Sequence, residues 1–240
     1  MHLLWEELRS AVPLIVHGNP YLLSIVSFTV EVAAIATAAA ALIGLPIGLA
    51  IGLGRFRGRH ALHVLANASL GLPPVLVGLF LFLILVPQGP LGSLHLLITK
   101  QAVFIAQTIL ALPYVVALTA AAIQGLPQGL LSQARVLGAG RRQLATLALR
   151  EARIGVMAAL IAALGSALSE VGAIVIVGGN VYGFDQTLAS AALYEANAAR
   201  YDDAVAIGIV LIALILVLMC AVGVLQQQGA GIRLRFRSAS

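Results

Sequence analysis

Charged residues are scarce in this chain of 240 residues: only 10% of its positions are Asp, Glu, Lys or Arg, whereas 61% are hydrophobic. Soluble globular proteins carry about 25% charged residues, so this composition excludes an ordinary water-soluble domain. The single cysteine, Cys220, excludes an internal disulfide. The first residues lack a basic segment ahead of an apolar core, so we expect no cleaved signal peptide.

Lysine occurs once, as Lys100, preceded by Thr99. A nucleotide-binding P-loop needs a lysine within a glycine-rich loop to reach the phosphates, so this chain is not expected to bind ATP in that way. The long apolar runs contain no histidine and no aspartate. An intramembrane enzyme would need a metal or acid-base constellation there. We therefore expect a protein that is not an enzyme, with no catalytic residue, metal ligand or bound cofactor of its own.

What the chain has instead is apolar length. A membrane-crossing helix needs about 20 apolar residues. Runs of this length cover 32–53, 64–86, 102–123, 154–177 and 204–225, and Glu170 is their only charged residue. These runs predict an all-α polytopic membrane protein with five transmembrane helices. Prolines inside the first three runs (Pro46, Pro73, Pro74 and Pro113) predict bends, either for packing or around a pathway.

The basic residues indicate the orientation. Eleven of the 14 lie between the first two runs, between the third and fourth, or after the fifth. By the positive-inside rule these segments are cytoplasmic. We therefore expect an extracytoplasmic N-terminal segment (1–28) and a basic cytoplasmic tail (227–240). The net charge of +5 then reflects topology, and no nucleic-acid partner is expected.

The longest cytoplasmic connection, residues 124–153, contains the segment ARVLGAGRRQLATLALREAR, with five arginines in 20 residues. Its pattern predicts a short helix with Pro127 in its first turn, a left-handed cap at Gly138, and a second helix running directly into the fourth span. Arginines alone would only set the topology. A helix–glycine–helix arrangement also offers a surface to which another protein can bind.

The fourth span carries the candidate pathway residues. Ser166, Ser169, Glu170 and Gly172 lie on faces rich in small residues, which suit close helix contact or an aqueous pathway. A carboxylate inside the membrane is costly, which makes Glu170 a functional candidate; the alternative is a structural hydrogen bond or an ion pair with Lys100 or Arg200. The span ends at Gly178–Asn180, a helix cap or a gate, and the outer loop that follows is expected to hold a short helix.

Three segments resemble the permease subunits of ABC importers. The cytoplasmic segment resembles their coupling loop, whose signature is Glu-Ala-Ala, three residues, Gly, nine residues and Ile-x-Leu-Pro. Ala134, Gly138 and Ala139 match it, whereas Ser132 replaces the acid and Glu151 the proline. The stretches NASLGLPPVLVGLFL and ALSEVGAIVIVGGN are similar to segments of molybdate- and tungstate-type permeases, with the tungstate branch the more similar. The resemblance covers about residues 29–226.

The resemblance implies a type I ABC importer permease fold in the inner membrane, with 29–226 as the transmembrane domain. It implies a homodimeric pore on two copies of a cytoplasmic ATPase, which binds ATP and Mg, and an extracytoplasmic binding protein that delivers an oxyanion, tungstate first and molybdate next. ATPase coupling would fall on Ser132, Gln133, Ala134, Leu137, Gly138, Ala139, Arg141 and Arg142. The pathway or gate would involve Ser166, Ser169, Glu170, Gly172 and Asn180.

The alternative function is a stand-alone channel or secondary carrier for a small solute. Secondary carriers are typically built from internal repeats, with carboxylates that bind the coupling ion. This sequence has one strong intramembrane acid, Glu170, and no convincing repeat.

Overall fold

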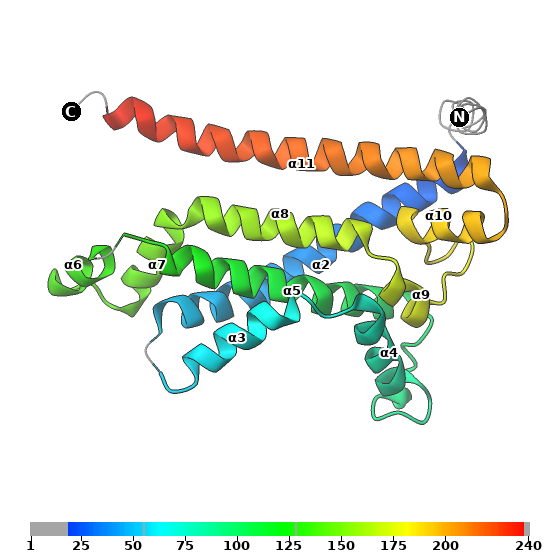
Figure 1. Cartoon of the computed structure of the whole chain (residues 1–240), viewed down its shortest axis with the longest axis horizontal. Coiled ribbons are helices and arrows are strands. Elements are labelled where there is room, and N and C mark those ends of the chain that lie inside the picture. The colour runs from blue at the N-terminus through cyan, green and yellow to red at the C-terminus, as the bar shows by residue number, and fades with distance from the viewer. Residues whose placement is uncertain (1–18, 55, 128, 238–240) are drawn as a thin grey trace. The chain divides into compact units, whose positions relative to one another are not determined.

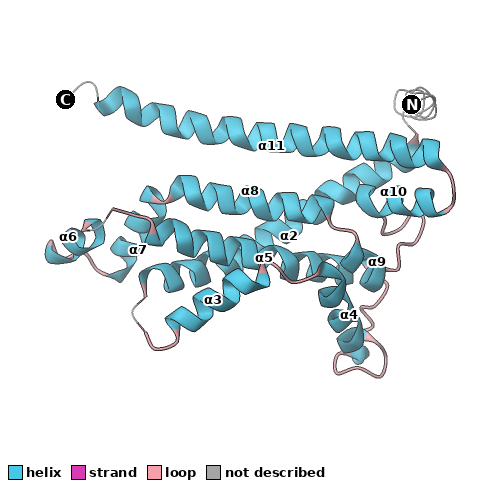
Figure 2. Cartoon of the chain, viewed as in Figure 1, coloured by secondary structure: helices cyan, strands magenta, loops and turns pink. Residues whose placement is uncertain are grey.

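The computed structural model describes residues 19–54, 56–127 and 129–237, and this part of the chain is helical, without a strand (Figures 1 and 2). Most of the predicted N-terminal segment, 1–28, lies outside the described residues. In chain order the elements are α2 (Pro20–Leu53), α3 (Arg59–Ser69), α4 (Pro74–Leu85), the 3₁₀ turn η1 (Gly92–Leu94), α5 (Lys100–Gln124), α6 (Leu130–Val136), α7 (Arg141–Glu151), α8 (Arg153–Ser169), α9 (Gly172–Gly178), α10 (Leu188–Asn197) and α11 (Tyr201–Arg237).

Three of the expected spans are continuous helices. α2, α5 and the Tyr201–Val224 part of α11 are each long and apolar enough to cross a membrane. Two bent helix pairs, α3 with α4 and α7 with α8, bring the number to five if each pair forms one span. α2 begins well before the predicted residue 32, and α11 continues through most of the predicted tail. The short helix expected in the outer loop is α10.

The bend predicted at Pro73 and Pro74 is confirmed: the second predicted span consists of two helices, α3 and α4, which meet at an angle of 103°. The cause is local: a proline disfavours helical backbone at the residue before it. Pro73 precedes Pro74 and has the extended angles φ −62° and ψ 122°, while Pro74 occupies the first helical position of α4. Pro46 and Pro113, in contrast, remain inside α2 and α5.

The fourth predicted span is also interrupted. α8 ends at Ser169 and α9 begins at Gly172, so the apolar run is two helices rather than one. The predicted continuous passage from the basic segment into this span is wrong too, since α7 and α8 are bent by 71°. At the bend, Ala148 and Ala152 are buried against Ile123 at the end of α5. The turn in the chain keeps these small residues packed.

By its contacts the chain divides into two compact units, the first formed by residues 1–36, 73–110 and 165–219. In this unit α4 and α9 pack together through Leu81, Leu85 and Val177. Gly78 permits their close approach, because a Cβ added there would lie 2.7 Å from the Cα of Ala173. The N-terminal part of α2 packs through Ile25 against α10 and the start of α11.

The second unit comprises residues 37–72, 111–164 and 220–240. Its core is a close contact between α2 and α5, made through glycines at every fourth position of α2: Gly44, Gly48 and Gly52. A Cβ added at these glycines would lie 2.8–2.9 Å from side-chain atoms of Val115, Thr119 and Ile123. This is the small-residue spacing by which membrane helices approach closely.

Candidate functional site: coupling loop and broken fourth span

The predicted helix–glycine–helix in residues 124–153 is present. α6 begins at Leu130, directly after Gly129, whose φ is 99°. Pro127 therefore precedes the helix and is not in its first turn as predicted, although its carbonyl accepts a hydrogen bond from the Leu130 N–H at 3.2 Å.

Gly138 ends α6 in the predicted left-handed conformation, with φ 86°. The Gly138 N–H donates to the Arg135 carbonyl at 3.0 Å, and the Ala139 N–H donates to the Ala134 carbonyl at 2.9 Å. This pair of bonds is the Schellman arrangement, which satisfies carbonyls left free at a helix end. A Cβ added to Gly138 would meet no atom within 4 Å, so glycine is required there by the backbone angle and not by space.

α7 begins with two cations. The N–H of Gly140 donates to Oε1 of Gln143 at 2.8 Å, which caps the helix start, and Arg141 and Arg142 follow in the first turn. Cations at a helix N-terminus are disfavoured by the helix dipole. Both arginines are exposed, so their placement does not serve the stability of α7.

Two adjacent apolar residues precede the glycine turn and these arginines. Val136 and Leu137, at the end of α6, are each 87% exposed. Leu137 is a predicted coupling residue, whereas Val136 was not predicted. Among the remaining predicted residues, Ser132, Gln133, Gly138, Arg141 and Arg142 are exposed and Ala134 and Ala139 are half-buried. The turn thus gathers all eight predicted coupling residues on one short helix–turn–helix that presents two uncovered hydrophobic side chains.

The predicted pathway residues lie at the interruption of the fourth span. Glu170 is half-buried between α8 and α9, and its Oε1 accepts a hydrogen bond from the Ala173 N–H at 3.2 Å. The carboxylate therefore caps α9, which supports the structural hydrogen bond considered for it. Ser169 is exposed, and its hydroxyl donates to the Gly165 carbonyl at 3.0 Å. Ser166 and Gly172 are half-buried.

The ion pairs considered for Glu170 are wrong. Arg200 pairs with Glu195 and lies 3.9 Å from Asp203. Nζ of Lys100 stands over the rings of Phe28 and Phe184, at 5.0 and 5.6 Å from their centroids. On the predicted small-residue face, Gly172 lies in close contact with α4, since a Cβ added there would lie 2.5 Å from the side chain of Val75, whereas Ser169 is exposed. Ala159, Ala163 and Ala167 of α8 are buried.

Asn180 belongs to the cap of α9. Gly179 has φ 90° and ends the helix, as the capping interpretation predicts, and Asn180 follows with φ 54°. Its Nδ2 donates to the Ser190 carbonyl at 3.3 Å, while its Oδ1 is buried without a partner.

Sequence reasoning missed several buried polar side chains, among them Asp185 and Gln107. Asp185 is fully buried; its Oδ1 accepts from the Val181 N–H at 2.5 Å and its Oδ2 has no partner. Burial raises the pKa of Asp185. Gln107 is fully buried inside α5, and neither of its amide atoms is hydrogen-bonded. A lone amide in the apolar run 102–123 was a signal that could have singled it out. In the described part of the chain no cluster of His, Cys, Asp or Glu could hold a metal ion.

Comparison with known proteins decides the family. Residues 44–228 match the model of the "Binding-protein-dependent transport system inner membrane component". The chain belongs to this family. The match covers the part of α2 that contains Gly44, Gly48 and Gly52, the coupling loop and the broken fourth span.

Two curated relatives are similar over most of their length. A "Probable anion ABC transporter permease protein" of Haloferax volcanii is 41% identical, over 82% of this chain and 87% of the relative. The "Tungstate uptake system permease protein TupB" of Peptoclostridium acidaminophilum is 30% identical, over 95% of this chain and all of the relative. Among solved structures, a bacterial ABC transporter that imports alginate superimposes with a TM-score of 0.70 at 19% identity, over 90% of this chain and 82% of that one.

As a member of this family, the chain is the permease subunit of an ABC importer: a multi-pass inner-membrane protein, and a pore component rather than an enzyme. The all-helical architecture agrees with the fold of the solved importer.

Proposed function

We propose that this chain is the pore subunit of an ATP-driven importer for a tetrahedral oxyanion, tungstate first and molybdate next. The observation that carries the proposal is the α6–Gly138–α7 turn with its two exposed apolar residues. The choice of anion is supported by similarity to a tungstate permease, which matches over 95% of this chain and over all of its own length. An extracytoplasmic binding protein would deliver the anion, and two permease copies would enclose the pathway.

The proposed ATPase contact follows from what the turn exposes. Two uncovered hydrophobic side chains on a basic loop are unfavourable in water, and burial in a partner would remove their apolar surface from solvent. The adjacent cations would add charge complementarity. Since the only lysine is Lys100, outside any glycine-rich phosphate loop, ATP and Mg would be bound by that partner.

In the proposed membrane orientation the α6–Gly138–α7 turn lies in the cytoplasm, with the N-terminus outside and the C-terminus inside. The arginines of residues 124–153 support this orientation through the positive-inside rule. α10 and the start of α11 then lie on the extracytoplasmic side, where a binding protein would dock. A stand-alone channel or carrier would have no use for an exposed apolar turn on the inner side.

The test is a double substitution, Val136→Ser with Leu137→Ser. Losing both apolar anchors should lower co-purification of the ATPase at least tenfold, because interface energy concentrates in a few buried side chains. The matched control is Leu91→Ser with Leu94→Ser, another exposed apolar pair, 46% and 55% exposed, in the loop after α4. Equal ATPase recovery from both double variants would contradict the docking role.

A further inference from the structure

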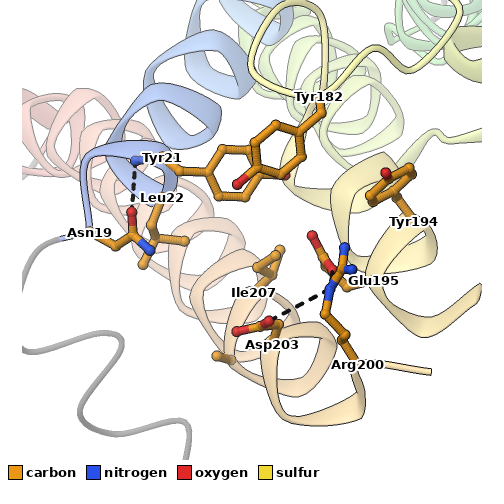
Figure 3. Close-up of a pocket in the computed structure, with 10 residues that line it drawn as sticks. Asn19, Tyr21, Leu22, Tyr182, Tyr194, Glu195, Arg200, Asp203 and Ile207 are labelled. Carbon is orange, nitrogen blue, oxygen red and sulfur yellow. Dashed lines mark hydrogen bonds and ion pairs between the residues drawn. The ribbon is translucent and has the colours of Figure 1, made fainter. Parts of the chain in front are cut away.

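A pocket of about 340 Å³ is lined by residues of the first unit, and none of the coupling or pathway residues line it. Its walls come from the start of α2, the loop after α9, α10 and the start of α11 (Figure 3). Ligand pockets in proteins occupy about 300–1,000 Å³, so this one suits a single long side chain or a small molecule.

Three tyrosines form an aromatic wall. The rings of Tyr21 and Tyr182 stack with centroids 4.3 Å apart and 14° between their planes, and the ring of Tyr194 is 6.3 Å from that of Tyr182. The Tyr21 hydroxyl donates to Oε1 of the buried Gln186 at 2.7 Å, which fixes one ring of the stack. Figure 3 shows Tyr21 and Tyr182 lying face to face at the pocket.

The charged groups of the pocket are unbalanced toward the acidic side. Glu195 is 3% exposed and accepts a hydrogen bond from Nε of Arg200, which also lies 3.9 Å from a carboxylate oxygen of Asp203. Two carboxylates thus face one guanidinium, which leaves the lining with a formal charge of −1. Arg200 in addition covers the Tyr194 ring, with its central carbon 5.7 Å from the centroid.

This chemistry selects a cation. Aromatic faces attract ammonium and guanidinium groups, and an acidic lining adds to that attraction. The same lining repels an oxyanion, so the pocket is unsuited to the transported substrate. Since the walls belong to the side assigned as extracytoplasmic, the cation would come from a protein outside the membrane.

We infer that the pocket receives one lysine or arginine side chain of the binding protein when that protein docks. The inference rests on the proposed function, because it needs a binding protein as partner. It adds the chemistry of the contact: an acidic aromatic socket on the permease and a basic side chain on the protein that delivers the anion.

The experiment measures ATPase activity of the complete permease–ATPase complex in nanodiscs, titrated with the purified binding protein of the same importer. Asp203→Asn and Tyr182→Leu should each raise the concentration of binding protein that gives half-maximal stimulation by about three- to tenfold, with maximal and basal activities unchanged. The controls are Asp202→Asn and Phe184→Leu, exposed neighbours that do not line the pocket. The controls should behave like the unmodified complex.

A charge-swap series identifies the partner residue. Asp203→Lys should abolish tight docking, and one Lys→Glu or Arg→Glu variant of the binding protein should restore it. An unchanged half-maximal concentration in both pocket variants, or a lower one in Asp203→Asn, would overturn the inference while leaving the importer intact. Absence of stimulation in the unmodified complex would instead overturn the proposed function.

Discussion

Asp185 is the residue whose burial has the clearest measurable consequence. Its carboxyl is fully enclosed, with one oxygen bonded to the Val181 N–H and the other without a partner. Removing the carboxylate from water disfavours its charged form, and burial is the main cause of its raised pKa. The carboxyl of Asp185 therefore binds its proton more tightly in the folded protein than in the unfolded chain.

A raised folded-state pKa gives a definite sign of the pH dependence. The contribution of Asp185 to stability is complete below its ordinary unfolded-state pKa, about 3.9, and is lost as the pH rises through the higher folded-state value. Asp185→Asn copies the neutral form, so its melting temperature minus that of the unmodified protein should increase between pH 4 and pH 7. A difference that falls with pH at position 185 would refute the assignment.

At the scale of elements, the contact between α2 and α5 depends on the absence of side chains at Gly44, Gly48 and Gly52. A Cβ at Gly48 would lie 2.9 Å from the Val116 carbonyl oxygen, which is backbone and cannot move aside alone. Gly48→Ala should therefore destabilise the protein by about 1–3 kcal/mol, in the range of overpacked cores.

Thermal unfolding of the purified protein measures the effect, with Gly208→Ala as the matched control. Gly208 is also a helical glycine of a membrane-crossing segment, but an added Cβ there would meet nothing within 4 Å. Alanine should be neutral at that position or stabilising by up to about 1 kcal/mol through helix propensity. Similar losses in both variants would show that close helix approach is not the cause.

The helices also show which structural features could be predicted from this sequence. Apolar length predicted α2, α5 and α11, and the turn at Gly138 was predictable because a left-handed glycine after a short helix is a local signal. Hydropathy reports length but not direction. Pro73 and Pro74 predicted the bend between α3 and α4, whereas no residue of this kind marked the bend between α7 and α8. The glycines of α2 did not indicate which helix packs against them, and the structure shows that this helix is α5.

The candidate sites likewise differ in whether a local sequence signal could predict them. The coupling turn lies within a few residues of chain, and its predicted members come together as expected. The aromatic socket joins Tyr21 to Tyr182 and Tyr194, more than 150 residues away, so no local pattern could reveal it. Burial of Asp185 likewise depends on packing against Gly178, where an added Cβ would lie 2.5 Å from the carboxylate.

For the molecule as a whole, the two units are expected to contact different partners. The second unit, which contains the coupling loop, would receive force from an ATPase, and the first unit would present the socket for the binding protein. The fourth span is interrupted at Glu170, whose carboxylate caps α9, and the residues around this interruption, 165–172, belong to the first unit. This division requires that the chain transports nothing without its partners.

Uptake into proteoliposomes tests that requirement most directly. Vesicles containing this chain with its ATPase, ATP inside and tungstate-loaded binding protein outside, should accumulate tungstate, and molybdate should compete. Vesicles that lack only the ATPase should accumulate none. Tungstate uptake by this chain alone, without ATPase or ATP, would contradict the central claim and establish a stand-alone carrier.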